Sequence, residues 1–153
     1  ETEIRRVIYD MHPPVLDQMG LVVALKRFAG TYQITFNIEC QVEIGGEPQR
    51  LHRETEITIY RIIQAALHNV ATHAQAKHAK VYFDFGTAAL QVMIEDDGIG
   101  FNPEGVMRLP GEHLGLIGMK ERAEGLRADL TVNSAPGKGS RITLSVPAPV
   151  YLE

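Results

Sequence analysis

Asn69 is a residue whose type and position could support metal or phosphate chemistry. It lies within the segment 54–72, where apolar residues recur at steps of three and four and predict a long helix with one buried face. An amide oxygen is a hard ligand that suits Mg²⁺, which accepts one or two protein oxygens beside phosphates and waters. A solvated or capping asparagine is the alternative interpretation. The same helical steps place four other residues on the face of Asn69: Arg61, Ala65, Thr72 and His73.

The second candidate is an acidic pair followed by two glycines, Asp96-Asp97-Gly98-Ile99-Gly100. Two alternating segments, 81–85 and 90–94, predict a strand hairpin, and its second strand runs directly into the acidic pair. A carboxylate at this strand end could accept a hydrogen bond from an exocyclic amine, while the glycines would let a ligand approach the backbone closely. An ordinary acidic turn is the alternative interpretation.

Two further glycine-rich segments follow in the second half of the chain. Residues 111–116 open a predicted helix, and backbone N–H groups at the start of a helix favour phosphate. Gly137-Lys138-Gly139-Ser140 resembles the end of a phosphate-binding P-loop. However, Val132 stands where that loop requires its first glycine, and Gly139 stands where it requires serine or threonine. We therefore interpret this segment as a tight hairpin turn.

The elements expected to position these residues form a two-layer α/β sandwich. Segments whose apolar residues recur every three to four positions predict helices, and segments whose apolar residues alternate predict short strands. Glycine and proline mark the boundaries between these segments. Helices are expected over 4–11, 21–28, 54–72 and 116–126, the second of them ending near Gly30. Strands are expected over 33–43, 81–85, 90–94, 130–133 and 140–146. Short antiparallel connections mixed with helices predict a mixed, largely antiparallel sheet, covered on one face by about three helices.

Composition excludes several classes of protein. The 153 residues, of which 44% are hydrophobic, fit one globular domain, and the longest apolar run, 21–25, is too short to span a bilayer. A net charge of −4 argues against a nucleic-acid binder. The lone Cys40 excludes an internal disulfide and favours the cytoplasm, including the cytoplasmic part of a membrane-anchored sensor. His68, His73 and His78 are spaced by five residues, which does not stack metal ligands on a helix, so we interpret them as structural.

The order of these four elements along the chain resembles the Bergerat ATP-binding fold of gyrase, heat-shock chaperones, mismatch-repair proteins and histidine kinases. Three further segments resemble the nitrate- and desaturase-sensor branch of the sensor histidine kinases. They are Met11-His12-Pro13-Pro14-Val15-Leu16-Asp17-Gln18-Met19-Gly20-Leu21, Tyr60-Arg61-Ile62-Ile63-Gln64 and Gly115-Leu116-Ile117-Gly118-Met119-Lys120-Glu121-Arg122. The resemblance covers nearly the whole chain and implies the ATP-binding catalytic domain of such a kinase.

This resemblance assigns roles to individual residues. Asn69 would ligate Mg²⁺, Asp96 would bind the adenine amino group, and residues 101–114 would form a mobile lid. His73 resembles the histidine that follows the family's asparagine, although a packed histidine at a helix end explains it equally well. The other residues expected to border ATP are Gly98 and Gly100 at the adenine, Gly111, Gly115 and Leu116 at the phosphates, and Gly137 and Gly139 at the base of the pocket.

The chain also departs from the family pattern at two positions. Ala65 stands where the branch places a glutamate, and Thr72 stands where it places a lysine or arginine, so no catalytic residue is assigned. The phosphate charge would then need another cation, for which the sequence offers Arg61, Arg108 and Lys120. No histidine in the sequence is followed by an acidic residue, so the phosphoacceptor is expected on another domain.

The resemblance implies that residues 1–12 end a preceding dimerisation and phosphoacceptor region and that residues 13–153 form the ATPase domain. Its expected function is to bind Mg-ATP and donate the γ-phosphate to a histidine on the adjacent helix domain in two-component signalling. The expected partners are that domain and a response regulator, with a homodimeric full-length protein and a monomeric isolated domain. Ala65 and Thr72 leave open a nucleotide sensor without transfer, and an interaction domain that binds no nucleotide is a third interpretation.

Overall fold

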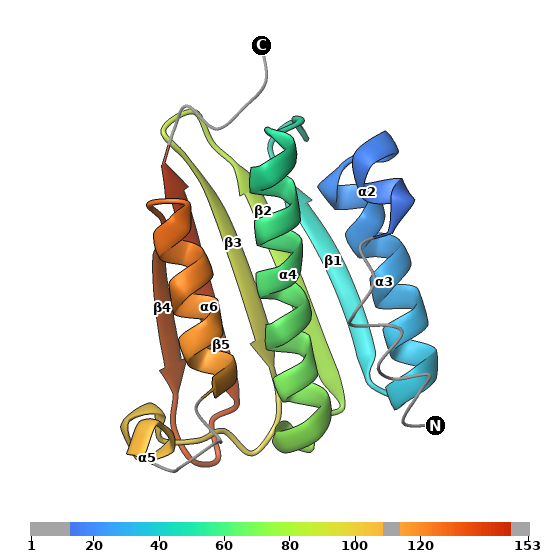
Figure 1. The fold of residues 1–153 in the computed structure, drawn as a ribbon. Helices are drawn as coiled ribbons and strands as arrows, with labels where there is room; N and C mark the ends of the chain where they lie inside the picture. The colour runs from blue at the N-terminus through green and yellow to red at the C-terminus, as the bar shows by residue number, and fades with distance from the viewer. Residues whose placement is uncertain (1–12, 109–113, 148–153) are drawn as a thin grey trace.

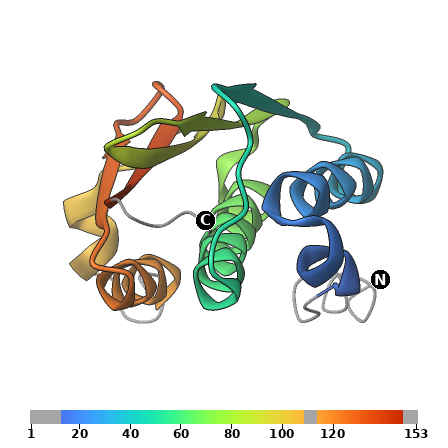
Figure 2. The same cartoon turned by 90° about the horizontal axis from the view of Figure 1, so that it is seen from above.

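The computed structural model of the chain describes residues 13–108 and 114–147, which form one sheet covered on one face by helices (Figure 1, Figure 2). The strands are β1 (Glu39–Gly45), β2 (His78–Phe85), β3 (Ala89–Asp96), β4 (Asp129–Ser134) and β5 (Ser140–Pro147). They follow the spatial order β1-β2-β3-β5-β4, in which β1 and β2 run parallel and the other neighbours run antiparallel. The predicted two-layer sandwich with a mixed, largely antiparallel sheet is therefore confirmed.

Three long helices, α3, α4 and α6, cover the same face of the sheet, as Figure 2 shows. The helices are α2 (Pro14–Met19), α3 (Leu21–Phe36), α4 (Arg53–Asn69), α5 (Pro103–Arg108) and α6 (Leu114–Gly125), and α4 continues into a short π-helix, η1 (Val70–Ala74). None of the helices in the described ranges is long and apolar enough to cross a membrane. The expected helix over 4–11 lies outside the described residues.

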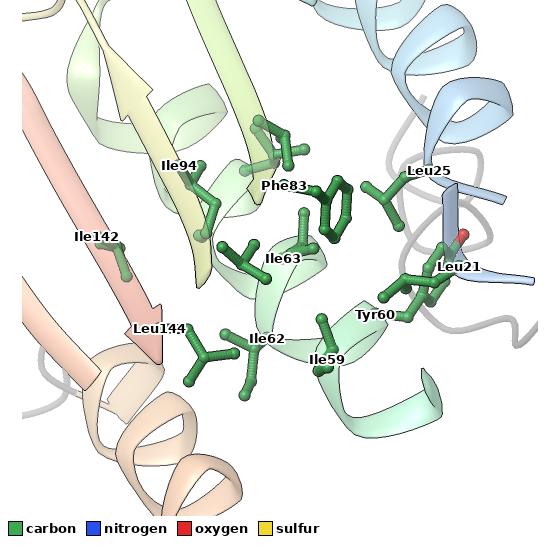
Figure 3. Close-up of a cluster of buried hydrophobic side chains, with 14 of the residues drawn as sticks. Leu21, Leu25, Ile59, Tyr60, Ile62, Ile63, Phe83, Ile94, Ile142 and Leu144 are labelled. Carbon is green, nitrogen blue, oxygen red and sulfur yellow. The ribbon is translucent and has the colours of Figure 1, made fainter. Parts of the chain in front are cut away.

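The core lies between α4 and the centre of the sheet. The isoleucine stripe of α4, with Ile59, Ile62 and Ile63 fully buried, packs toward Phe83 and Ile94 on β2 and β3 (Figure 3). Complete burial of each such side chain stabilises the folded state by roughly 1.5–3 kcal/mol. Because α4 carries the deepest part of the core, it is a rigid base from which its last turn can position a ligand.

The boundary between helix α3 and strand β1 differs from the prediction. The helix expected to end near Gly30 continues to Phe36, and the strand expected over 33–43 begins at Glu39 instead. The aromatic rings at positions 28, 32 and 36 explain the difference. At steps of four residues along a helix the rings pack against one another in a tilted arrangement, with centroids 6.0 and 5.0 Å apart. The helix ends only at Asn37, whose left-handed backbone (φ 56°) forms its C-terminal cap.

A short helix was also missed within the segment expected to form a lid. Helix α5 occupies Pro103–Arg108, shortly after Gly98-Ile99-Gly100, the segment called the glycine loop below. Asn102 caps it, since its side-chain oxygen accepts hydrogen bonds from the backbone N–H groups of Glu104 at 3.1 Å and Gly105 at 3.4 Å. Pro103 takes the first helical position, where its missing N–H costs nothing. Residues 109–113 of the expected lid lie outside the described residues.

Candidate functional site

A cavity of about 210 Å³ lies where the end of α4, η1, the end of β3 and the start of α6 meet, at the lower end of the view in Figure 1. Its polar lining consists of Asn69, His73, Asp96 and Ser140. Its apolar lining includes Val70, Ile94, Ile99, Phe101, Val106, Leu116 and Ile142. An apolar cavity with a few convergent polar groups is the usual form of a small-molecule site.

Asp96 enters this cavity because of the strand register. Side chains alternate along β3, so Asp96 shares a face with the buried Ile94, and its partner on β5 is Ser140. One carboxylate oxygen accepts the Gly98 N–H at 2.8 Å, and the other accepts a short hydrogen bond from the Ser140 hydroxyl. Two bonds use only part of a carboxylate's capacity of about four, so Asp96 is held in a fixed orientation and can accept a ligand donor as well.

Asp97 has a different environment. Its Oδ1 accepts the backbone N–H groups of Lys77 and His78, both at 2.9 Å, and its Oδ2 lies 2.6 Å from Nδ1 of the His78 ring. The backbone hydrogen bond from His78 is the largest of several causes that lower the pKa of Asp97 to about 2. Of the acidic pair, Asp96 therefore faces the cavity, while Asp97 fastens the end of β3 to the start of β2.

The glycine loop and the hairpin turn before β5 pack directly on each other. Gly100 and Gly139 both have left-handed backbones, with φ of 68° and 69°, and a Cβ at either position would strike a neighbouring carbonyl oxygen. The N–H of Phe101 donates to the Ser134 hydroxyl at 2.9 Å, and that hydroxyl donates to the Gly139 carbonyl at 2.8 Å. The structure thus brings together two glycine motifs that lie far apart in the sequence.

Gly98 and Gly137 take part in the same packing. Gly98 lies against the carbonyl oxygen and methyl group of Ala74, where a Cβ would clash. Gly137 donates its N–H to the carbonyl of Ile99 at 2.5 Å. Gly100 lines the cavity, whereas Gly98, Gly137 and Gly139 are not among the described residues that line it.

Asn69 and the start of α6 form the other end of the site. A Cβ built on Gly115 would lie 3.2 Å from the Asn69 side-chain oxygen, so a glycine here lets α6 approach the amide closely. Leu116, the next residue, is 5% exposed and lines the cavity, as does His73. Gly111 lies outside the described residues.

Thr72 and Ala65 do not line the cavity in the part of the chain that the structure describes. Thr72 is exposed, and its hydroxyl donates to the His68 carbonyl at 2.9 Å, while Ala65 is partly buried against the core. His68 is exposed, and partial desolvation, reinforced by the neighbouring His73, lowers its pKa. His68 is not among the described residues that line the cavity.

Sequence reasoning did not assign Ser140 to the site, nor any residue of the apolar walls other than Leu116. Ser140 lies directly across from Asp96, and Ile142 directly across from Ile94, in the β3–β5 register. This pairing depends on β5 returning beside β3, which no local pattern reveals. Strand alternation alone could have placed Ile94 with Asp96, because they are two residues apart on one strand.

The fold is a two-layer sandwich, and its apolar cavity lies between the central helix, an acidic strand end and a glycine loop. This combination is typical of the class of ATPase domains that includes those of histidine kinases. Residues 54–150 match the family model described as "Histidine kinase-, DNA gyrase B-, and HSP90-like ATPase", and the chain belongs to this family. The resemblance inferred from the motif order is confirmed.

Sensor kinases are among the chain's relatives. The signal transduction histidine-protein kinase/phosphatase DegS of Brevibacillus brevis is 34% identical over 145 residues, which cover 95% of this chain and 37% of the relative. The oxygen sensor histidine kinase NreB of Staphylococcus carnosus is 28% identical over 145 residues, 95% of this chain and 41% of the relative. The chain therefore spans about two fifths of the length of these relatives.

Solved structures show the same fold. The histidine kinase domain of the Erythrobacter litoralis EL346 blue-light activated histidine kinase superposes with a TM-score of 0.65 at 23% identity, covering 83% of this chain and 64% of that one. The Acinetobacter baumannii histidine kinase AdeS gives a TM-score of 0.67 at 16% identity, covering 84% and 64%. At these identities the likeness concerns the fold alone.

Proposed function

We propose that this chain binds Mg-ATP in the cavity beside α4 and donates the γ-phosphate to a histidine on a separate dimerisation helix domain, as part of two-component signalling. The observation that carries the proposal is the Asp96 carboxylate, held by Gly98 and Ser140 at the end of an apolar cavity. A carboxylate acceptor in such a place suits the exocyclic amine of adenine, and the apolar walls suit its ring.

The other end of the cavity fits the phosphates. The Asn69 amide lies beside Gly115 in the first turn of α6, so an oxygen ligand and the N–H groups of a 12-residue helix face the same space. A Mg²⁺ that keeps its waters and binds phosphate oxygens needs few oxygen ligands from the protein, and the Asn69 amide would supply one. When bound, Mg²⁺ would supply neutralisation of the phosphate charge.

In this proposal the protein accelerates transfer by positioning the γ-phosphate and supplies no general base. Ala65 offers no group to activate a nucleophile, so transfer depends on holding the γ-phosphate in line with an incoming imidazole. The residues of α4 and α6 orient the triphosphate, and the glycine loop holds the adenine end. The acceptor domain, a response regulator, a homodimeric whole protein and a cytoplasmic location belong to the same proposal.

A nucleotide sensor that transfers nothing is the second candidate. The observations that favour it are Ala65 and Thr72, which stand where the family pattern places a carboxylate and a cation on the helix beside the phosphates. Both candidates predict nucleotide binding, and only the first predicts a phosphorylated acceptor.

Replacement of Asp96 by asparagine tests the adenine assignment. Asp96→Asn exchanges an ionised acceptor for a neutral amide, and we expect ATP and ADP to bind more weakly by about 1.5–3 kcal/mol, the usual range for hydrogen bonds to charged groups. Isothermal titration calorimetry with Mg²⁺ present measures this loss. Asp84→Asn is the matched control, since Asp84 is exposed at the opposite end of the β2–β3 hairpin and should keep wild-type affinity. Equal affinity of Asp96→Asn and wild type would refute the assignment.

A further inference from the structure

Helix α4 changes its hydrogen-bonding pattern at the cavity. Regular α-helix ends at Asn69, the N–H of Val70 is shared between the carbonyls of Ala66 and Leu67, and residues 70–74 continue as a π-helix. A π turn is rare, contains one extra residue, and occurs frequently at functional sites. Because it rotates every residue that follows, its position decides which side chains face the cavity.

A hydroxyl from another helix lies at the start of this wide turn. Tyr32 on α3 is fully buried, and its hydroxyl donates to the Leu67 carbonyl at 2.8 Å. Its ring packs between Phe28 and Phe36, so the side chain cannot turn away without disturbing the aromatic stack. The next carbonyl, that of His68, accepts the Thr72 hydroxyl at 2.9 Å. Two successive carbonyls before the π turn are thus bound by side chains.

The residues after Leu67 build one wall of the cavity. Asn69, Val70, His73 and Ala74 all line it. The Ala74 carbonyl also accepts the Ile99 N–H at 2.8 Å, which joins the π turn to the glycine loop. The turn now begins directly after Asn69, so a shift of its start toward Leu67 would rotate the Asn69 amide as well and move the anchor of the glycine loop with it.

We propose that Tyr32 is a positioning residue of the nucleotide site, whose hydroxyl fixes the point at which α4 widens into the π turn. The effect on Mg-ATP binding rests on the proposed function, whereas the effect of Tyr32 on the π turn does not. A regular α-helix would satisfy the Leu67 carbonyl with the N–H four residues later. The Tyr32 hydroxyl binds that carbonyl in addition to the shared Val70 N–H, and so anchors α4 to α3 directly before the wide turn. Tyr32 touches the site only through α4, since it does not line the cavity.

Tyr32→Phe removes this hydroxyl and keeps the ring. Tyr60→Phe is the matched control, because Tyr60 on α4 is also a buried tyrosine, 3% exposed and packed against Phe28 of α3. Its hydroxyl interacts with the Gln64 side chain, and Tyr60 lies about two turns before Leu67. We expect Tyr32→Phe to bind Mg-ATP about three- to tenfold more weakly, the range for loss of one ordinary hydrogen bond, and Tyr60→Phe to stay within about twofold of wild type. The gain in ATP affinity on adding Mg²⁺ should also fall in Tyr32→Phe, since Asn69 is displaced.

Amide hydrogen exchange of the unliganded protein gives a second measurement that needs no nucleotide. We expect Tyr32→Phe, and not Tyr60→Phe, to speed exchange at residues 70–74 and at the Ile99 N–H. Faster exchange at those amides together with the lost Mg²⁺ gain supports the inference. Unchanged exchange there, or an unchanged Mg²⁺ gain in a variant that binds ATP, overturns it. If wild type binds no nucleotide, the proposed function fails, while the exchange data still decide whether Tyr32 sets the turn.

Discussion

At the scale of single residues, the two adjacent aspartates show how one strand end serves two purposes. Asp96 follows the alternation of β3 into the cavity, whereas Asp97 turns to the backbone of residues 77 and 78. The sequence shows both as carboxylates before a glycine, and the choice of Asp96 came from resemblance. The structure adds the physical reason: Asp96 shares the inward face of Ile94, and Asp97 does not.

Acid should weaken the fold through Asp97. Folding lowers its pKa from 3.8 to about 2, so its stabilising contribution is complete above about pH 4 and is lost as the pH falls from there toward 2. We expect Asp97→Asn to be less stable than wild type at pH 5 and the difference to shrink by pH 2.5. Asp97 is half exposed, so the effect is modest and weakens with salt. Urea unfolding of both proteins across this range measures it, and a constant difference would show that Asp97 does not act through its charge.

At the scale of elements, helix α3 shows side-chain packing outweighing the tendency of glycine to end a helix. Gly30 was interpreted as the end of a helix, yet three aromatic rings spaced by four residues continue past it and gain contacts only if the helix continues. The cost of one glycine in a helix, about 1 kcal/mol relative to alanine, is smaller than the gain from packing such rings. The helices at 54–72 and 116–126 were predicted well because nothing competes with their periodicity.

Gly30→Ala should therefore stabilise the protein. A Cβ at Gly30 meets no atom within 4 Å, and the backbone there is helical, so alanine removes only the excess freedom of glycine in the unfolded chain. We expect a gain of about 0.5–1 kcal/mol in the free energy of unfolding, measured by urea titration. Gly139→Ala, the same change at a left-handed position against the Asp96 carbonyl, should lose stability. A loss at Gly30 would mean that α3 ends where the sequence suggested.

At the scale of the whole molecule, the order of motifs predicted the fold and most of the candidate site, but not how the parts touch. Asn69 and Gly115 are far apart in sequence, and their contact depends on α6 packing beside α4. Ser140 and the hydroxyl of Tyr32 were missed for the same reason, because each acts across elements that only the sheet order brings together. Local patterns predict elements, whereas these contacts depend on tertiary packing.

Phosphoryl transfer to an added acceptor tests the proposed function most directly. The chain would be incubated with Mg-ATP labelled at the γ-phosphate, alone and with a helix domain whose histidine is followed by an acidic residue. We expect no label on the chain itself, because its six histidines lack that motif, and a label on the acceptor that survives base, is lost in acid and falls strongly with Asp96→Asn. Stable labelling of the 153-residue chain alone would contradict the proposal. Tight ATP binding with an unlabelled acceptor would identify the domain as a nucleotide sensor instead.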